Sequence, residues 1–219
     1  NQTPHDVTVL THEAGHAFQV FQSRNHMPDY VWPTFEACEI HSMSMEFLTW
    51  PWMNLFFKED TDKFKYYHMT TAIKFLPYGV TVDEFQHEVY ENPELTPQER
   101  RMKWLEVERK YLPSRYYEEI PELDEGLFFY RQGHLFSVPF YYIDYTLAQV
   151  CAFQFWKKAN ENREKAWEEY LHLCKQGGTK PFLELVKEAN LENPFKDGTI
   201  SNIVPELKKY LDSVDATKF

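Results

Sequence analysis

Long hydrophobic runs are missing from this sequence of 219 residues. No stretch approaches the roughly 20 apolar residues that a membrane-spanning helix requires. The first residues also lack the basic segment followed by an apolar segment that marks a secretory signal peptide. We therefore expect no membrane as a partner and no secretion signal in this stretch of chain.

Basic residues and cysteines are both scarce. Lys and Arg total 23 against 34 Asp and Glu, which gives a formal net charge of −11. Phosphate backbones repel so acidic a chain, and nucleic acid is therefore not an expected partner. Cys38, Cys151 and Cys174 are odd in number and far apart. A disulfide scaffold is not expected, and a reducing, cytoplasmic location is favoured.

Glycine and proline are limited to 7 and 13 residues, and 43% of the sequence is hydrophobic, which is typical of a globular chain with a core. The strict alternation of strands is nearly absent. Apolar residues instead recur at spacings of three and four, which predicts an all-α fold. Helices are predicted over residues 6–23, 35–49, 52–76, 82–90, 97–111, 140–160, 163–175, 181–189 and 201–213. Pro51 and Pro77 are expected to end helices, residues 126–139 are not assigned, and no linker indicates a second domain.

The first predicted helix contains the sequence His12-Glu13-Ala14-Gly15-His16, a His-Glu-x-x-His pattern. Helical residues four apart differ by only about 40° in azimuth, so the imidazoles of His12 and His16 can reach one metal ion. Glu13 lies about 100° further round, which suits it to hold a water molecule rather than the ion. Such a pattern also arises by chance on a solvated helix, but the helical sequence on both sides favours a zinc site.

A catalytic zinc ion needs a third protein ligand and an open position for water. The metzincin pattern would place glycine and histidine where this chain has Gln19 and Gln22, so that class is excluded. The gluzincin pattern takes a glutamate from a following helix, and Glu36, Glu39 and Glu46 are the candidates. Glu39 and Glu46 are seven apart and share a helix face within about 20°, so one can bind the ion while the other supports the site. Glu36 lies about 60° away and is the weaker candidate.

A later aromatic segment offers further polar groups. Tyr141 and Tyr145 are four residues apart and hence on one helix face. Their phenols are donors of the kind that stabilise developing negative charge. The alternative is a stripe of core aromatic residues, which we favour for Phe140, Tyr142 and Leu147.

Three segments together resemble the thimet oligopeptidase and oligoendopeptidase F family of zinc metallopeptidases. These segments are residues 11–19, residues 33–42 and residues 133–145, and the resemblance extends in order over essentially the whole chain. It corresponds to the C-terminal catalytic portion of the family fold, a zincin-type helical domain. We therefore expect residues 1–219 to be that portion of a larger, mostly helical peptidase, with the N-terminal portion absent from this chain. The lack of an initiator methionine agrees with this expectation.

The resemblance also implies roles for individual residues. It implies that one zinc ion per chain is bound by His12, His16 and Glu39, with Glu13 as the general base. By the same similarity, a histidine and tyrosines of the aromatic segment bind the substrate and stabilise the oxyanion. The matching residues here are His134, Tyr141 and Tyr145.

Two functions are compatible with these patterns. The first is a zinc-dependent endopeptidase that hydrolyses internal bonds of oligopeptides, with the missing N-terminal portion as an expected partner. The second is a catalytically silent helical binding module that keeps a structural zinc ion. A structural zinc site is closed by four protein ligands and usually includes cysteine, and no cysteine here has the required spacing. The enzyme is therefore the favoured hypothesis.

Overall fold

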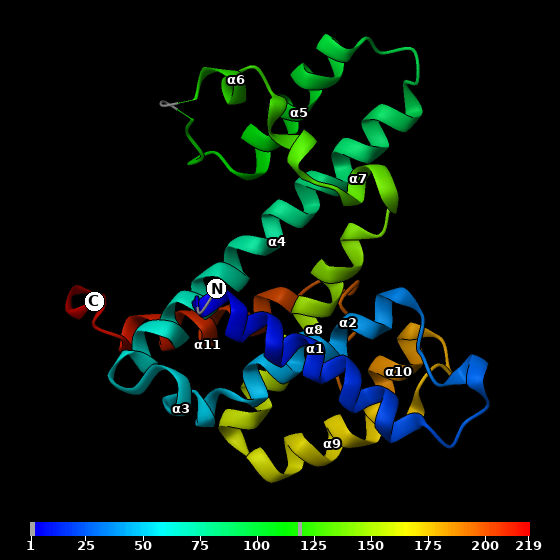
Figure 1. The fold of residues 1–219 in the computed structure, drawn as a ribbon, viewed down its shortest axis with the longest axis vertical. Helices are drawn as coiled ribbons and strands as arrows, with labels where there is room; N and C mark the ends of the chain where they lie inside the picture. Colours follow the sequence, from blue (N-terminus) through cyan, green and yellow to red (C-terminus); the bar gives the residue numbers. More distant parts are fainter. Residues whose placement is uncertain (1–2, 118–119) are drawn as a thin grey trace. The chain divides into compact units, whose positions relative to one another are not determined.

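The computed structural model describes residues 3–117 and 120–219, and this described part consists of helices and loops without a β-strand (Figure 1). The all-α prediction is confirmed. Two compact units are present, one formed by residues 1–71 and 147–219 and the other by residues 72–146. The boundaries fall inside continuous helices, which explains why the sequence shows no linker. None of the described helices is long and apolar enough to cross a membrane.

Helix α2 (Phe35–Leu48) is the centre of the first unit. Nearly all its side chains from Ala37 onward are buried, because the helix has few charged residues and packs against α1, α9 and α10. The other elements of this unit are α1 (Pro4–Ser23), η1 (Pro28–Tyr30), η2 (Trp50–Trp52), α3 (Asn54–Phe57), η3 (Lys58–Asp60), the first part of α4 (Thr61–Glu91), most of α8 (Tyr142–Glu161), α9 (Arg163–Gln176), α10 (Phe182–Glu188), α11 (Thr199–Ser213) and η5 (Ala216–Lys218).

Helix α1 begins with a capping box, in which Thr3 and Asp6 each bind the other's backbone. The backbone N–H of Thr3 donates to Asp6 Oδ2 at 2.7 Å, and the backbone N–H of Asp6 donates to Thr3 Oγ1 at 3.3 Å. Pro4 occupies the first helical position, where its missing N–H costs nothing. The helix therefore starts two residues before the predicted residue 6.

The second unit is organised around the buried side chains of Val82, Phe85, Trp104 and Phe129. Its elements are the rest of α4, α5 (Pro97–Tyr111), α6 (Pro121–Asp124), η4 (Leu127–Arg131), α7 (His134–Ser137) and the first residues of α8. The segment that the sequence left unassigned, residues 126–139, consists largely of the short helices η4 and α7.

The predicted helix break at Pro77 is wrong, because α4 continues through this residue. An interior proline removes one backbone hydrogen bond and costs about 3 kcal/mol. Burial of apolar side chains on both sides offsets this cost, since Met69 and Val82 are fully buried. The predicted start of this helix at residue 52 is also wrong, because Lys58 adopts a positive φ of 48° that an α-helix cannot contain.

Candidate metal centre

His12 and His16 on α1 and Glu39 on α2 form the cluster that could bind a metal ion. Each offers one ligand atom, and the three atoms lie within 4.8 Å of one another. Glu39 Oε2 lies 3.2 Å from His12 Nε2 and 3.4 Å from His16 Nε2. The structure thus brings together the three residues that the sequence pairs with zinc, and two imidazoles with one carboxylate are a donor set that zinc accepts.

Gly15 allows the two helices to approach closely enough for this arrangement. A Cβ atom at Gly15 would lie 2.7 Å from Ser42 Cα and 2.8 Å from the carbonyl oxygen of His41. Both are backbone atoms of α2, which a side-chain rotation cannot move away. The glycine between the two histidines therefore sets the distance from α1 to the helix that supplies Glu39.

We expect the substitution Gly15→Ala to push α1 away from α2. Overpacking of this kind typically costs about 1–3 kcal/mol of stability, and separation of the imidazoles from Glu39 should weaken metal binding as well. Thermal unfolding and zinc titration check both effects. Gly133→Ala is the matched control, because a Cβ there meets no atom within 4 Å. Equal stability of the two variants would contradict the close-approach argument.

Glu46 supports the cluster from the side away from the three ligand atoms. Its Oε1 lies 2.7 Å from His12 Nδ1, and its Oε2 lies 2.7 Å from His68 Nε2. Trp50 Nε1 donates to His68 Nδ1 at 3.0 Å, which extends the chain of hydrogen bonds. A carboxylate on the second nitrogen of a metal-binding histidine fixes the ring and its tautomer. The sequence placed Glu39 and Glu46 on one face, whereas it gave no sign of His68 or Trp50.

The two carboxylates favour a positive charge at His12. Burial lowers the pKa of this imidazole, but the hydrogen bonds to Glu39 and Glu46 outweigh burial and raise the pKa to about 10. For Glu46, burial raises the pKa, and the hydrogen bonds to His12 and His68 outweigh it and lower the pKa. The negative charges of the same two carboxylates would also attract a metal cation at this position. These residues therefore fit a divalent ion.

Glu13, Glu36 and His41 differ in their surroundings. Glu13 is exposed on α1 beside the histidines, and none of the described residues forms a hydrogen bond with its side chain. Glu36 is half-buried and does not belong to the three-residue cluster. His41 is fully buried, and burial followed by the charge of nearby His16 lowers its pKa to about 3. His41 is therefore a neutral, packed residue of α2.

A second cluster, in residues 72–146, contains His134, Tyr141 and Tyr145. The ring centroid of His134 lies 6.2 Å from that of Tyr141 and 5.6 Å from that of Tyr145, and the two tyrosine rings are 4.9 Å apart. The side chain of Gln132 contacts His134 Nδ1 at 2.7 Å. The structure thus brings these three predicted residues together, and they present one imidazole and two phenols from adjoining elements.

The turn before Tyr141 is built around Phe140, which adopts a positive φ of 63°. Its backbone N–H donates to Gln86 Oε1 of α4 at 2.7 Å, and its ring contacts Tyr90. These contacts stabilise a backbone conformation that is costly for a residue other than glycine. Phe140 is 36% exposed, so the expectation that it is a core residue is wrong, whereas Tyr142 packs against the core of this unit.

Comparisons with known proteins agree on one family. The family model described as peptidase family M3 matches residues 2–204. An oligoendopeptidase F homolog of Borreliella burgdorferi is 30% identical over an alignment of 206 residues, which covers 86% of this chain and 34% of that protein. The range matched by the family model includes the residues of the histidine and glutamate cluster.

Solved structures agree in fold as well. A structure of Pz peptidase A with an inhibitor is 60% identical and has a TM-score of 0.95, covering 97% of this chain and 38% of that one. An oligoendopeptidase F from Bacillus anthracis is 55% identical with a TM-score of 0.86, covering 99% of this chain and 36% of that one. The fold is thus the helical peptidase fold of these structures. The chain belongs to peptidase family M3, which confirms the resemblance stated from the sequence, and it spans little more than a third of the length of these relatives.

Proposed function

We propose that this chain supplies the zinc site of a metalloendopeptidase that cleaves internal bonds of oligopeptides. His12, His16 and Glu39 would hold one zinc ion. The observation that carries this proposal is the convergence of their three ligand atoms within 4.8 Å, with the exposed Glu13 beside them on α1. Membership of a peptidase family supports the same reaction class.

Zinc in such sites supplies Lewis acidity and lowers the pKa of water toward about 7. The chain's own residues carry the proton transfers. Glu13, as general base, takes a proton from the attacking water with its carboxylate and passes it to the nitrogen of the leaving amine. Glu46 holds the His12 ring through Nδ1, which would leave Nε2 as the nitrogen that binds the ion.

His134, Tyr141 and Tyr145 are proposed to donate hydrogen bonds to the peptide oxygen as negative charge develops on it. Two phenols and an imidazole that are fixed before the reaction need no rearrangement in the transition state. The mutual ring contacts of these three residues support a shared role.

We expect Tyr141→Phe and Tyr145→Phe to lower kcat and kcat/KM together, by about 100-fold for a lost oxyanion donor. Zinc content and thermal stability should stay unchanged, because neither phenol belongs to the metal cluster. Steady-state kinetics with a quenched peptide checks this. Tyr142→Phe is the control, since Tyr142 packs against the core. If the variants lost thermal stability but showed no specific kinetic defect, Tyr141 and Tyr145 would be packing residues rather than oxyanion donors.

A catalytically silent module with a structural zinc ion is the alternative. Structural sites have four protein ligands, often cysteines. The candidate cluster in the described residues contains three ligands and no cysteine. A four-coordinate zinc ion held by these three residues would have one position left for water. This observation favours the enzyme.

Metal depletion tests the proposal directly. Because the chain spans little more than a third of its relatives, we also propose that an N-terminal portion of the same protein is a partner, and the assay is run with and without it. Dialysis against a chelator should abolish hydrolysis of a quenched oligopeptide, and one equivalent of zinc per chain should restore it. Stoichiometric zinc with no hydrolysis under either condition would favour the silent module.

A further inference from the structure

The imidazole of His68 is buried and is linked to the candidate metal centre through Glu46. His68 belongs to the first part of α4 and is 6% exposed. Its Nε2 lies 2.7 Å from Glu46 Oε2, and its Nδ1 accepts the indole N–H of Trp50 at 3.0 Å. The other oxygen of Glu46 lies 2.7 Å from His12 Nδ1. Side chains of α4, η2, α2 and α1 are thus joined in one chain of hydrogen bonds, and only His12 among them is a proposed ligand.

Trp50 decides which nitrogen of His68 carries hydrogen. An indole N–H donates but cannot accept, so His68 Nδ1 must present a lone pair to it. A hydrogen atom on Nδ1 would point at the indole hydrogen instead. The hydrogen of the His68 ring therefore lies on Nε2, which donates it to Glu46 Oε2. This tautomer is the one that satisfies both contacts of the ring.

Aromatic neighbours hold both rings in this orientation. The ring centroid of His68 lies 4.6 Å from that of Phe47 and 5.8 Å from that of Phe64, to which the imidazole is nearly parallel. Trp50 is 7% exposed, and its ring packs edge-on against that of Trp156. The N–H of His68 Nε2 therefore keeps one direction, toward the carboxylate on α2.

The hydrogen bond from His68 anchors the Glu46 carboxylate. The terminal torsion of a glutamate is broad, so a carboxylate held at one oxygen only can turn. Because His68 holds Oε2, Oε1 stays beside His12 Nδ1. The side chain of Glu46 is 11% exposed, so little water competes for either oxygen. His68 thus acts on the orientation of His12 without touching it.

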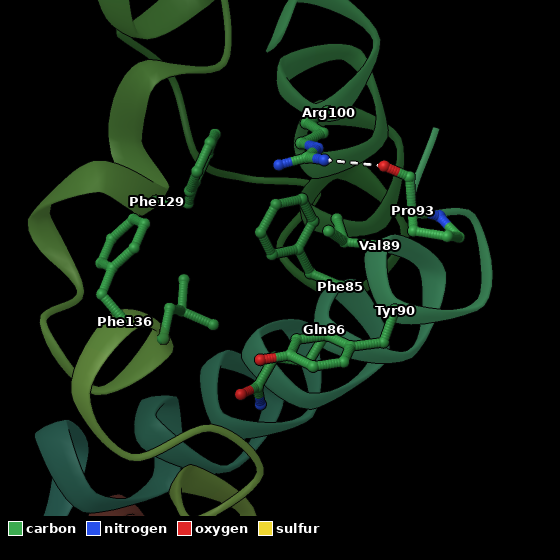
Figure 2. Close-up of a pocket in the computed structure, with 9 residues that line it drawn as sticks. Phe85, Gln86, Val89, Tyr90, Pro93, Arg100, Phe129 and Phe136 are labelled. Atoms are coloured by element: carbon green, nitrogen blue, oxygen red, sulfur yellow. Dashed lines mark hydrogen bonds between the residues drawn. The ribbon is translucent and has the colours of Figure 1, made fainter. Parts of the chain in front are cut away.

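Full pairing of buried polar atoms is not general in this chain. Gln86, drawn in Figure 2 at an apolar cavity of residues 72–146, accepts a hydrogen bond at Oε1 but leaves Nε2 buried without a partner in the described part of the chain. The same holds for Nε2 of His41. A buried network whose members are all paired is rigid and stabilises one arrangement. The complete pairing of Glu46 and His68 therefore favours a positioning role for this network.

We propose that Trp50 and His68 are positioning residues of the zinc site. Trp50 sets the tautomer of His68, His68 anchors Glu46, and Glu46 orients the ring of His12. This inference rests on the proposed zinc site, because it assigns to Trp50 and His68 an effect on zinc affinity. It requires that one N–H group on an indole, which is not a ligand, alters how tightly the ion is held.

The zinc affinity of the full 219-residue chain, with the proposed N-terminal portion present, tests the role of His68. His68→Leu should lower the affinity about 10- to 100-fold, the range for residues that support a metal-binding histidine. His68→Gln should retain more affinity than His68→Leu, because its amide keeps an N–H donor for Glu46 and an acceptor for Trp50. Competition with a calibrated chelator measures both variants.

Trp50→Phe removes the N–H donor and keeps an aromatic ring, so it should lower zinc affinity by about tenfold. Trp156→Phe is the matched control. It makes the same change in a ring that packs against Trp50, and both nitrogens of His68 are bonded to other residues. Thermal unfolding of the metal-free variants is measured alongside. A merely structural role would lower the unfolding temperature and leave the zinc affinity of the folded chain unchanged.

The tautomer of His68 is measured without zinc. In the metal-free chain labelled with ¹⁵N-histidine, long-range NMR correlations from the ring C–H groups show which nitrogen carries hydrogen. The signals that disappear in His68→Leu are those of His68. We expect hydrogen on Nε2 in the unmodified chain and loss of this single tautomer in Trp50→Phe.

Three results would overturn the inference: hydrogen on His68 Nδ1, equal zinc affinities of His68→Leu and His68→Gln, or equal effects of Trp50→Phe and Trp156→Phe on zinc affinity. An unmodified chain that binds no zinc would instead contradict the proposed function. A chain that binds zinc with one affinity in all four variants would contradict only the positioning role, so the two failures are distinguishable.

Discussion

Replacing Glu13 by glutamine should lower kcat by roughly 100- to 10,000-fold while the chain keeps one zinc ion. The substitution preserves the size of the side chain and removes the basic oxygen that accepts the proton. Glu13 is exposed and is not one of the three clustered ligands, so its loss should not disturb metal binding. Steady-state hydrolysis of a quenched oligopeptide and metal analysis of the same sample measure the two effects.

Glu36→Gln is the matched control for this experiment. It makes the same chemical change at a half-buried glutamate in the same unit, outside the metal cluster. We expect its kcat to remain near that of the unmodified chain. If Glu13→Gln lost zinc, Glu13 would belong to the ligands, and the proposed division between binding and proton transfer would be wrong.

The parts of the site that the sequence predicts are those that depend on local helix geometry. The i, i+4 spacing of His12 and His16 places both imidazoles on one face of any helix, whatever packs against it. The seven-residue spacing of Glu39 and Glu46 likewise puts both carboxylates on one face of α2. Spacing alone does not tell the two glutamates apart, although the family resemblance implies Glu39 as the ligand. The structure places Glu39 beside Nε2 and Glu46 beside Nδ1 of His12.

The parts that the sequence did not predict depend on contacts between distant segments. His68 meets Glu46 across 22 residues of chain, and no local spacing indicates that pair. The passage of α4 through Pro77 depends on burial of neighbouring side chains, which outweighs the local cost of proline.

Removing single carboxylates should separate the three glutamates by their effect on zinc affinity. Glu39→Ala removes a ligand, so we expect affinity to fall by more than the roughly 100-fold upper range for supporting residues. Glu46→Ala removes no ligand but the hydrogen bonds to His12 Nδ1 and His68 Nε2, which should cost about 10- to 100-fold. Glu36→Ala should leave zinc affinity unchanged, since Glu36 lies outside the cluster.

Competition with a calibrated chelator measures these affinities, and thermal unfolding of each metal-free variant separates lost binding from lost folding. Glu39 is buried and accepts a hydrogen bond from Ser42 Oγ at 2.9 Å, so its truncation also leaves a small cavity and restricts that hydroxyl to the backbone carbonyl of residue 39, at 3.1 Å. Glu39→Gln is the second variant, because it keeps the shape of the side chain and an acceptor for Ser42 and removes only the negative charge. It should also bind zinc far more weakly than Glu36→Gln does. Equal zinc retention by the Glu39 and Glu36 variants would mean that the ion is bound on another face of α2.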